Sequence, residues 1–365
     1  MKKIKIILAG PGNGVEGGIP AVISGLEKCF FILKNQVEYK RLVYAKAQRG
    51  MTLFQRIFSE IIQFFRFIYQ LKEYSPDIVH IQTSFDKKTI LRDSVHSWIT
   101  HIFKIKSVIH IHGGNWHDLE NWNYFWKTLA SKFLKKCELV IVTSEEELKW
   151  VENYFEGKVR VSLLNNVVEL RLDIKKIRST NDNSGSIKKI IFASRLIESK
   201  GILDLINAIK LLDSRNDFIL HIYGSGVLEE NIKAMIKALN LSHNVCFEGE
   251  IDFDCLLSEY AKGDIFVFPS YHHEGFPMGF FLAVASGLSV VTTSVRPIPN
   301  FLKAHKNCLY IEKKSPKSIA ENISVLLDDT RLIKEMSKNN IELVNKFTSL
   351  AVSNELIHLY NLLEA

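Results

Sequence analysis

Cysteine is scarce in this sequence, and no two cysteines are spaced as a C-x-x-C pair. The 365 residues include only five, at well-separated positions: Cys29, Cys137, Cys246, Cys255 and Cys308. This count excludes a disulfide framework, argues against a structural zinc site and favours the reducing cytosol as the compartment. Low-complexity tracts are missing as well. With 47% apolar and 24% charged residues, the composition is that of a globular protein of two domains, or three at most.

Long apolar runs are nearly absent too. The opening MKKIKIILAG is basic and then apolar, but it reaches glycine after a few residues, which fits a first β-strand better than a signal peptide. One charge-free stretch of 18 residues, Met278–Val295, is long enough for a membrane span. Its serine, threonine and glycine residues between positions 286 and 294 fit a helix, a turn and a strand, and we favour that interpretation.

The net charge of +7 is unevenly distributed. Residues 1–180 carry 28 Lys and Arg against 18 Asp and Glu, whereas residues 181–365 carry 19 against 22. The first half therefore presents a positive field that suits phosphates, anionic lipid or nucleic acid. Nucleic acid is the weakest of the three, because no recognised nucleic-acid-binding motif accompanies the charge.

Short apolar runs alternate with helical periodicity in both halves, which predicts the α/β class with parallel sheets covered by helices. The strands expected in the first half are 3–9, 78–82, 107–112 and 139–143, and those in the second are 190–193, 218–223, 244–247, 265–269 and 289–293. A polar segment rich in Ser, Asn and Asp separates them. We expect an N-terminal domain at 1–170, a linker at 171–188, a C-terminal domain at 189–345 and a final helix at 346–365 that packs back on the first domain.

One segment, Leu53–Leu71, has a broad apolar side. At 100° per residue, its leucine, isoleucine, phenylalanine and tyrosine side chains fall together, while Arg56, Gln63, Arg66 and Gln70 fall opposite. The simpler interpretation is a helix that covers the sheet with this side. The alternative joins residues 40–71, which include a basic loop, into a peripheral contact with an anionic membrane.

The first glycine cluster, residues 9–18, follows a predicted strand and precedes a helix in which Pro20 suits the first turn. Glycines let the backbone approach a phosphate, and the helix N-terminus supplies free N–H groups. Gly12, Gly14 and Gly17 also fit G-x-G-x-x-G, with Glu38 as a possible ribose ligand, which is the dinucleotide-binding pattern. A turn without a ligand is the simpler alternative.

Two further segments carry polar side chains at the ends of predicted strands. In SerArgLeuIleGluSerLysGly, residues 194–201, Arg195 and Lys200 sit where a helix begins, which favours a diphosphate site over solvated surface charge. In the segment 269–287, Glu274 lies in a loop before a helix, where its carboxylate could accept hydrogen bonds from sugar hydroxyls. A lone glutamate in this place is more often a helix cap.

These segments together resemble the family 4 glycosyltransferases, which are retaining enzymes of the two-Rossmann-domain GT-B architecture. The resemblance covers most of the chain, and its order and spacing are specific. It rests on these elements: GlyGlyIle at 17–19, ProAspIleValHis at 76–80, HisGly at 112–113, ThrSerGlu at 143–145, Asn165 ahead of two valines, the 194–201 segment, TyrGlySerGly at 223–226, AsnValCysPheGluGly at 244–249 and the Glu274 loop.

The resemblance implies a role for each matching residue. Gly17 and Gly18 would meet the distal phosphate of a nucleotide sugar, and His112 would bind the donor sugar. Arg195 and Lys200 would neutralise the departing diphosphate, so that no metal or other cofactor is needed. Further residues complete the implied donor site: Glu274 and the main chain of Gly275, Phe276, Pro277 and Met278 at the sugar, and Cys246 and Phe247 at the base.

The sequence departs from the family pattern at two places. The second glutamate, eight residues after the first, is replaced by Leu282, which removes a charge-assisted hydrogen bond to the ribose worth about 1.5–3 kcal/mol. Arg296, Pro297 and Asn300 replace the glycine pair and the acid that normally follow the next strand. The preferred base and sugar are the properties that these changes affect.

We therefore expect a retaining transferase with two domains facing a central cleft, a nucleotide sugar, most simply a UDP-sugar, on the second domain and a lipid-linked or surface-polysaccharide acceptor on the first. Its expected location is cytoplasmic, at the inner face of the plasma membrane. Three alternatives remain open from the residues: an NAD-linked oxidoreductase, a nucleotide-sugar epimerase and a non-catalytic partner subunit, the last encouraged by Leu282.

Overall fold

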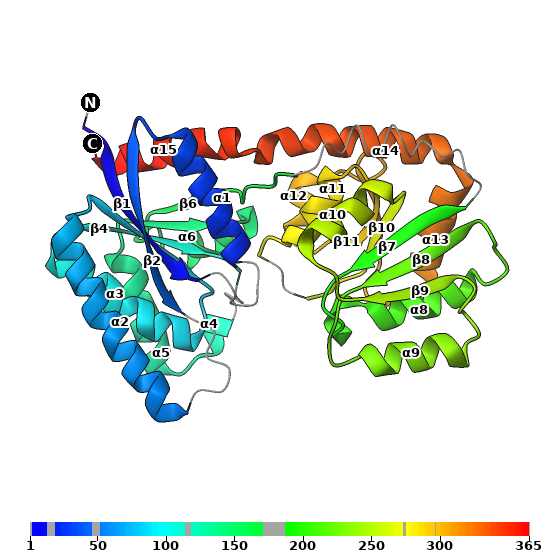
Figure 1. Ribbon diagram of the computed structural model, residues 1–365, viewed down its shortest axis with the longest axis horizontal. Coiled ribbons are helices and arrows are strands. Elements are labelled where there is room, and N and C mark those ends of the chain that lie inside the picture. Colours follow the sequence, from blue (N-terminus) through cyan, green and yellow to red (C-terminus); the bar gives the residue numbers. More distant parts are fainter. Residues whose placement is uncertain are drawn as a thin grey trace. The chain divides into compact units, whose positions relative to one another are not determined.

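A computed structural model describes residues 2–12, 19–45, 52–113, 118–170, 187–272, 275–295 and 297–364 of the chain. The chain divides into two compact units. The first consists of residues 1–167, 273–276 and 347–365, and the second consists of residues 168–272 and 277–346. Each unit contains one six-stranded parallel sheet with helices on its faces, so the predicted α/β class is confirmed (Figure 1).

The sheet of the first unit has the strand order β2-β1-β3-β4-β5-β6. Its strands are β1 (Ile4–Pro11), β2 (Val37–Ala45), β3 (Ile78–Thr83), β4 (Lys106–Ile111), β5 (Leu139–Val142) and β6 (Val161–Leu163). The helices of this unit are α1 (Ile19–Ile32), α2 (Leu53–Tyr74), α3 (Lys87–Ile102), α4 (Asp118–Asn121), α5 (Tyr124–Lys136), α6 (Glu145–Tyr154) and α15 (Ser349–Glu364). Every strand pairing is parallel, because a helix connects each strand to the next.

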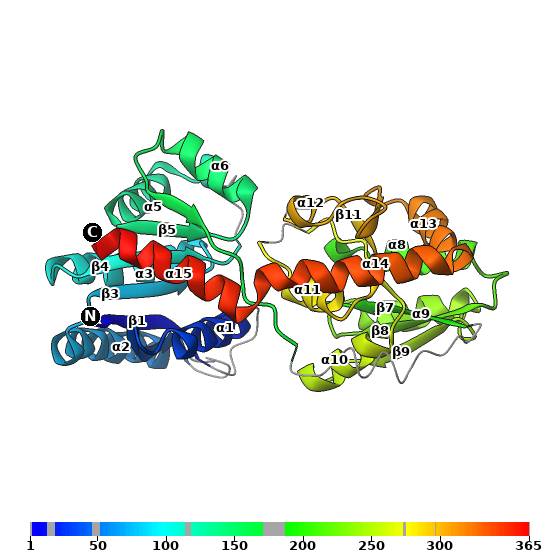
Figure 2. The same cartoon turned by 90° about the horizontal axis from the view of Figure 1, so that it is seen from above.

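Alternate side chains of β1 supply the two halves of the first core. Ile6 and Leu8 pack with α1 and α15 on one face, and Ile7 and Ala9 pack with α2, α3 and α5 on the other. Figure 2 shows α15 crossing the sheet beside α1. The Tyr360 hydroxyl of α15 is 2.7 Å from Nδ1 of His80 on β3, and both residues are fully buried. The last helix of the chain is therefore part of the core of the first unit.

The sheet of the second unit has the order β12-β11-β10-β7-β8-β9. Its strands are β7 (Lys188–Ala193), β8 (Phe218–Tyr223), β9 (Val245–Gly249), β10 (Ile265–Phe268), β11 (Ser289–Thr293) and β12 (Cys308–Ile311). The helices are α8 (Ile202–Leu211), α9 (Glu229–Ala238), α10 (Phe253–Lys262), α11 (Met278–Ala285), α12 (Ile298–Phe301), α13 (Pro316–Asp328) and α14 (Thr330–Leu343), with 3₁₀ turns η1 (Glu198–Lys200) and η2 (Val344–Phe347). Counted from β7, this is the strand order of the Rossmann fold.

All nine strands expected from the sequence are present, with ends that differ by no more than two residues. Three strands were missed, namely β2, β6 and β12, and each of them lies at an edge of its sheet. The charge-free stretch Met278–Val295 forms α11, a turn and β11, so the helix-turn-strand interpretation is confirmed. Among the described residues, no helix is long and apolar enough to cross a membrane.

Helix α2 covers the sheet with a different side from the one predicted. Gln63 and Gln70 are buried together with Phe67 and Leu71. The opposite side exposes a row of large apolar side chains, each between 48% and 79% accessible: Phe54, Phe58, Ile61, Ile62, Phe65 and Tyr69. The prediction that the broad apolar side packs on the sheet is therefore correct only for its border, where Phe64 and Ile68 contact the core, and wrong for the rest, because a narrower stripe suffices for that contact.

A buried asparagine joins three segments of the second unit. Nδ2 of Asn340 on α14 donates to the backbone carbonyls of Leu288 at 2.8 Å and Asn307 at 3.0 Å. Its Oδ1 accepts from the Asn307 side chain at 3.0 Å. Asn340 is fully buried, so these groups have no access to water if the amide is removed.

We predict that Asn340→Ala lowers the free energy of unfolding by about 2–4 kcal/mol, because it leaves several buried polar groups without a hydrogen-bond partner. The neighbouring Asn339 is half-buried and its side chain makes one hydrogen bond, to the Lys306 backbone carbonyl at the surface, so Asn339→Ala is the matched control and should cost no more than about 0.5 kcal/mol. Urea unfolding followed by circular dichroism measures both. Equal losses in the two variants would contradict this account of the network.

Candidate functional site

The second sheet has one point at which its strand order reverses. β7 lies between β8, its successor in the chain, and β10, which the chain reaches only after crossing back. The loops that leave neighbouring strands at such a point diverge to opposite faces of the sheet and leave a crevice at the carboxyl ends. Here these loops are residues 194–201 after β7 and residues 269–277 after β10, the two segments that the sequence analysis singled out.

The two loops are tied together by short contacts. The Tyr271 backbone N–H donates to the Ser199 carbonyl at 2.9 Å, and the Ser199 hydroxyl lies 3.1 Å from Nδ1 of His272. Gly201 has φ of +73°, and a Cβ added to it would stand 2.3 Å from the Pro269 carbonyl oxygen. Only glycine allows this approach, so the residue that ends the 194–201 loop fixes its distance from the neighbouring loop.

The loop after β8 packs against the same loop on its other side. Leu196 donates its backbone N–H to the Ser225 carbonyl at 2.9 Å. Gly224 has φ of +129°, and an added Cβ would lie 2.0 Å from the Ser194 carbonyl oxygen. The 194–201 loop is therefore held between two neighbours, and its side chains project from a fixed backbone.

Arg195 and Lys200 both lie on this loop, in different surroundings. Arg195 is exposed, and its guanidinium makes no hydrogen bond or ion pair with another residue that the structure describes, although its backbone carbonyl accepts from the Ile197 N–H at 3.0 Å. Lys200, in η1, is 5% exposed, and its ammonium lies 5.6 Å from the centre of the Phe268 ring at the end of β10. Both cations lie on one loop between β7 and α8, as expected, whereas their convergence on a diphosphate stays a prediction.

The third segment is described only in part. Glu274, the predicted sugar ligand, lies outside the described residues, as does Arg296. Gly275 and Phe276 group with the first unit, and Pro277 and Met278 with the second. Pro277 is the N-cap residue of α11 and, having no polar side chain, it makes no capping hydrogen bond to the first backbone N–H groups of that helix. Leu282 lies on this helix and is 4% exposed. It has no polar atom with which to bind a ribose hydroxyl.

Cys246 and Phe247 point to opposite faces of β9. Phe247 packs against the core beneath α8 and α9, whereas Cys246 lies beside His221 and Glu248. The structure therefore does not bring these two side chains into one space. A ring nitrogen of His221, Sγ of Cys246 and a carboxylate oxygen of Glu248 lie within 4.8 Å of one another, which would allow a metal ion. The His221 ring is already 2.8 Å from the Glu248 carboxylate, so an ion would have to displace that contact.

In the first sheet the order reverses between β1 and β3, and the glycine cluster follows β1. Gly14, Gly17 and Gly18 lie outside the described residues. Glu38, the ribose ligand of the dinucleotide-binding alternative, pairs in register with Lys5 near the start of β2. It therefore lies toward the amino edge of the sheet, whereas ligands of such folds bind at the carboxyl edge. This placement removes the acidic residue on which that alternative depended.

His112 directly follows β4, at the carboxyl edge of the first sheet. Its Nε2 lies 2.6 Å from Oε1 of Gln82 on β3, and its ring is 4.0 Å from the ring of His110. Burial lowers the pKa of His112 to about 3, so the imidazole is neutral at neutral pH. Gln82 was missed by the sequence analysis. Its position near the end of a predicted strand next to that of His112 is the signal that points to it.

Two family models match the chain, one after the other. The model described as glycosyl transferases group 1 matches residues 173–343, and that described as glycosyltransferase family 4 matches residues 33–172. The boundary between the two matches falls inside the polar segment predicted to separate the domains.

Related proteins agree with these matches. A glycosyltransferase of Methanocaldococcus jannaschii is 27% identical over 293 residues, which cover 73% of this chain and 74% of the relative. The capsular polysaccharide biosynthesis glycosyltransferase CapM of Staphylococcus aureus is 25% identical over 322 residues, or 84% and 82% of the two chains. A Campylobacter jejuni 4-alpha-N-acetylgalactosaminyltransferase, named for a diphospho-undecaprenol substrate, is 29% identical over 211 residues, or 57% and 56%.

Solved structures share the fold. Sucrose-phosphate synthase from Thermosynechococcus elongatus superimposes with a TM-score of 0.76 at 16% identity and covers 99% of both chains. Anabaena HepE in complex with UDP gives 0.74 at 15% identity and covers 98% of this chain and all of the other. With both halves matched by family models and this architecture throughout, the chain belongs to the glycosyltransferases of family 4 type with the GT-B fold.

Proposed function

We propose that the protein transfers a sugar from a nucleoside diphosphate, specifically a UDP-sugar, to a hydroxyl group of a lipid-linked or surface-polysaccharide acceptor, with retention of the anomeric configuration. The observation that carries this proposal is the pair of cationic side chains on the clamped 194–201 loop, at the reversal point of the second sheet. A diphosphate that gains negative charge as it departs is best stabilised by fixed cations and backbone N–H groups.

In this reaction the bond between the anomeric carbon and the diphosphate oxygen breaks, and a bond to the acceptor oxygen forms on the same face. Arg195 and Lys200 bind the diphosphate, with the N–H groups at the start of α11 close to the sugar. The departing phosphate oxygen takes the proton of the acceptor hydroxyl, so charge and protons balance without a metal ion. Glu274 and His112 hold the sugar hydroxyls, as the family resemblance implies.

The choice of UDP and of the acceptor draws on the similar proteins. HepE has been crystallised with UDP and with UDP-glucose. The S. aureus relative belongs to capsular polysaccharide biosynthesis, and the C. jejuni relative is named for an undecaprenol-linked substrate. These names support a polysaccharide or lipid-linked acceptor for this chain, which its basic first half suits as well.

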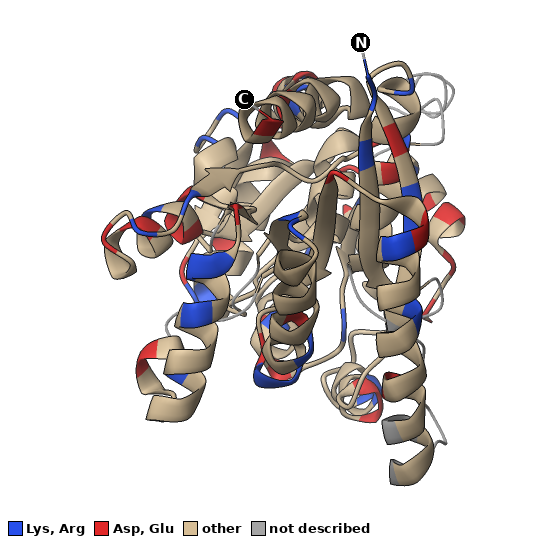
Figure 3. Ribbon diagram, turned by 90° about the vertical axis from the view of Figure 1, so that its left-hand side faces the viewer, with Lys and Arg blue, Asp and Glu red and all other residues tan. Residues whose placement is uncertain are grey.

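The exposed side of α2 supports contact with an anionic membrane. Six large apolar side chains line it over four turns, and Figure 3 shows few charged positions along this helix. A groove of about 440 Å³ opens beside it, lined by apolar side chains such as Phe58 and Ile62 and by the cation Arg66. Apolar side chains bordered by arginine and lysine are what an interfacial helix presents to anionic lipid. We propose that α2 rests in the headgroup region and brings the first unit to a lipid-linked acceptor.

We predict that Arg195→Ala and Lys200→Ala each weaken UDP binding by about ten- to a hundredfold, because each removes a charge-assisted contact of about 1.5–3 kcal/mol. Isothermal titration calorimetry with UDP measures this. Arg331→Ala and Lys317→Ala are matched controls, because both side chains are more than 80% exposed and lie on other helices of the same unit. Unchanged UDP affinity in both loop variants would defeat the site assignment.

The stereochemical outcome is a separate prediction. We expect the product glycoside to have the same anomeric configuration as the donor, because in the proposed reaction the acceptor attacks the anomeric carbon from the side on which the diphosphate leaves. Proton NMR of the first product formed from UDP-glucose, UDP-GlcNAc or UDP-GalNAc reports the configuration through the coupling of the anomeric proton. A product of opposite configuration would exclude this route.

We predict that Phe58→Ser combined with Phe65→Ser reduces binding to phosphatidylglycerol vesicles at least tenfold, because each phenylalanine contributes about 1.5–3 kcal/mol when buried in lipid. Co-sedimentation at rising salt measures the electrostatic part, which should weaken. Phe253→Ser, on α10 of the second unit, is the control for loss of an exposed phenylalanine. Vesicle binding that changes neither with salt nor with the two α2 substitutions would rule out α2 as the membrane-binding surface.

A further inference from the structure

The side chain of Gln82 contacts the imidazole of His112 at a defined nitrogen. Gln82 is completely buried on β3, and its Oε1 lies 2.6 Å from Nε2 of His112. As the amide is oriented, its oxygen faces Nε2, and an amide oxygen can only accept a hydrogen bond, so in this arrangement Nε2 carries the hydrogen. The amide nitrogen of Gln82 is buried and has no hydrogen-bond partner among the described residues. The neutral imidazole then has its lone pair on Nδ1, because only one ring nitrogen is protonated.

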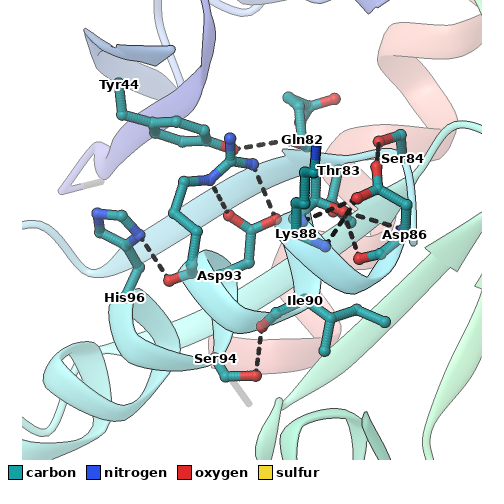
Figure 4. A network of polar contacts seen from close by, with 12 residues as sticks. Tyr44, Gln82, Thr83, Ser84, Asp86, Lys88, Ile90, Asp93, Ser94 and His96 are labelled. Carbon is teal, nitrogen blue, oxygen red and sulfur yellow. Dashed lines mark hydrogen bonds and ion pairs between the residues drawn. The ribbon is translucent and has the colours of Figure 1, made fainter. Parts of the chain in front are cut away.

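The backbone at Gln82 is held by contacts with β2 and α3. The Tyr44 hydroxyl donates to the backbone carbonyl of Gln82 at 2.7 Å, as Figure 4 shows. Tyr44 is held between the ring of His96 and the guanidinium of Arg92, which lies 4.3 Å from the centre of the Tyr44 ring. Arg92 in turn donates two hydrogen bonds to the buried carboxylate of Asp93, at 2.7 and 3.1 Å. The backbone of β3 at Gln82 is therefore anchored to α3 through four side chains.

Nδ1 of His112 is buried, and no residue that the structure describes forms a hydrogen bond with it. We propose that Gln82 is a positioning residue that holds His112 in the Nε2–H tautomer, so that Nδ1 accepts a hydrogen bond from a hydroxyl group of the bound sugar. This inference rests on the proposed function for its ligand, but the tautomer itself does not depend on it. It assigns to His112 the task of accepting a hydrogen bond rather than of moving a proton.

The surroundings of His112 keep the ring neutral, as this role requires. Burial lowers its pKa to about 3. The titratable groups next to it are histidines: His110 on β4 and, beyond it, His80 on β3. The hydroxyl of Tyr360 on α15 is hydrogen-bonded to His80. Burial and the neighbouring rings lower the pKa of His110 and His80 as well. No carboxylate among the described residues pairs with His112, whereas a glutamate in place of Gln82 would supply one.

The tautomer is measured directly by ¹⁵N NMR of the full chain labelled at histidine, with His112→Asn used to assign the resonance. We expect a protonated Nε2 and an unprotonated Nδ1 from pH 6 to 8. In Gln82→Glu the carboxylate should bring the imidazolium form into this range, because an opposite charge in contact favours the charged ring. A protonated Nδ1, or an imidazolium in the unaltered protein, would overturn the proposal without reference to any activity.

Kinetics test the role toward the sugar. Gln82→Leu, which removes the hydrogen-bond acceptor at similar size, should lower kcat at least tenfold while KM for UDP-sugar stays within about twofold, since the diphosphate contacts are elsewhere. Gln82→Glu should lose activity at low pH and regain part of it as pH rises. Gln70→Glu, another buried glutamine of the same unit, controls for a buried carboxylate and should leave the pH profile unchanged. A well-folded Gln82→Leu with unaltered kcat would refute the positioning role, whereas absence of any transfer by the unaltered protein would refute the proposed function and leave the tautomer standing.

Discussion

The approach of Gly201 to the carbonyl of Pro269 is the constraint on which the candidate site of the second unit depends. It sets how closely the loop after β7 can lie to the loop after β10, at the one place where the strand order of this sheet reverses. Two backbone hydrogen bonds, from Tyr271 to Ser199 and from Leu196 to Ser225, fix the orientation of the loop after β7 relative to its two neighbouring loops. The cations of the loop then project from a backbone that is already placed, so little conformational entropy has to be lost when an anion binds.

The first unit prepares its candidate residue in a different way. There, side-chain contacts rather than close backbone approaches hold the candidate residue. They run from Asp93 through Arg92 and Tyr44 to the strand that carries Gln82. Such buried polar networks are stable only when nearly every member has a partner, and they then allow one arrangement only. His112 Nδ1 is one of several buried polar atoms in this region without a partner among the described residues; the others include Nε2 of Gln82 and both ring nitrogens of His110. His112 is the one of these that directly follows β4 at the carboxyl edge of the sheet, where ligands of such folds bind.

The sequence was sufficient for the central strands and for the strand-end motifs, but three of the four edge strands, β2, β6 and β12, were missed. Central parallel strands such as β10 are buried on both faces and read as apolar runs, whereas β2, with Glu38, Lys40 and Arg41 among its residues, has the polarity of a loop. The side of α2 that packs on the sheet could not be predicted either, because periodicity shows where apolar residues gather and not which of them find a partner. Gln82 was missed for a related reason: its role depends on the neighbouring strand, which no local pattern reveals.

The three stacked histidines of the first sheet have a consequence for the behaviour of the protein in acid. Their pKa values are lowered by burial, those of His80 and His112 to about 3, while in an unfolded chain they would titrate at about 6.5. As the pH falls from about 6.5 to about 3, these histidines become protonated in the unfolded chain but stay neutral in the folded one, so the free energy of unfolding decreases. The same low polarity that keeps His112 uncharged at neutral pH thus lowers the stability of the first unit as the pH falls below about 6.5.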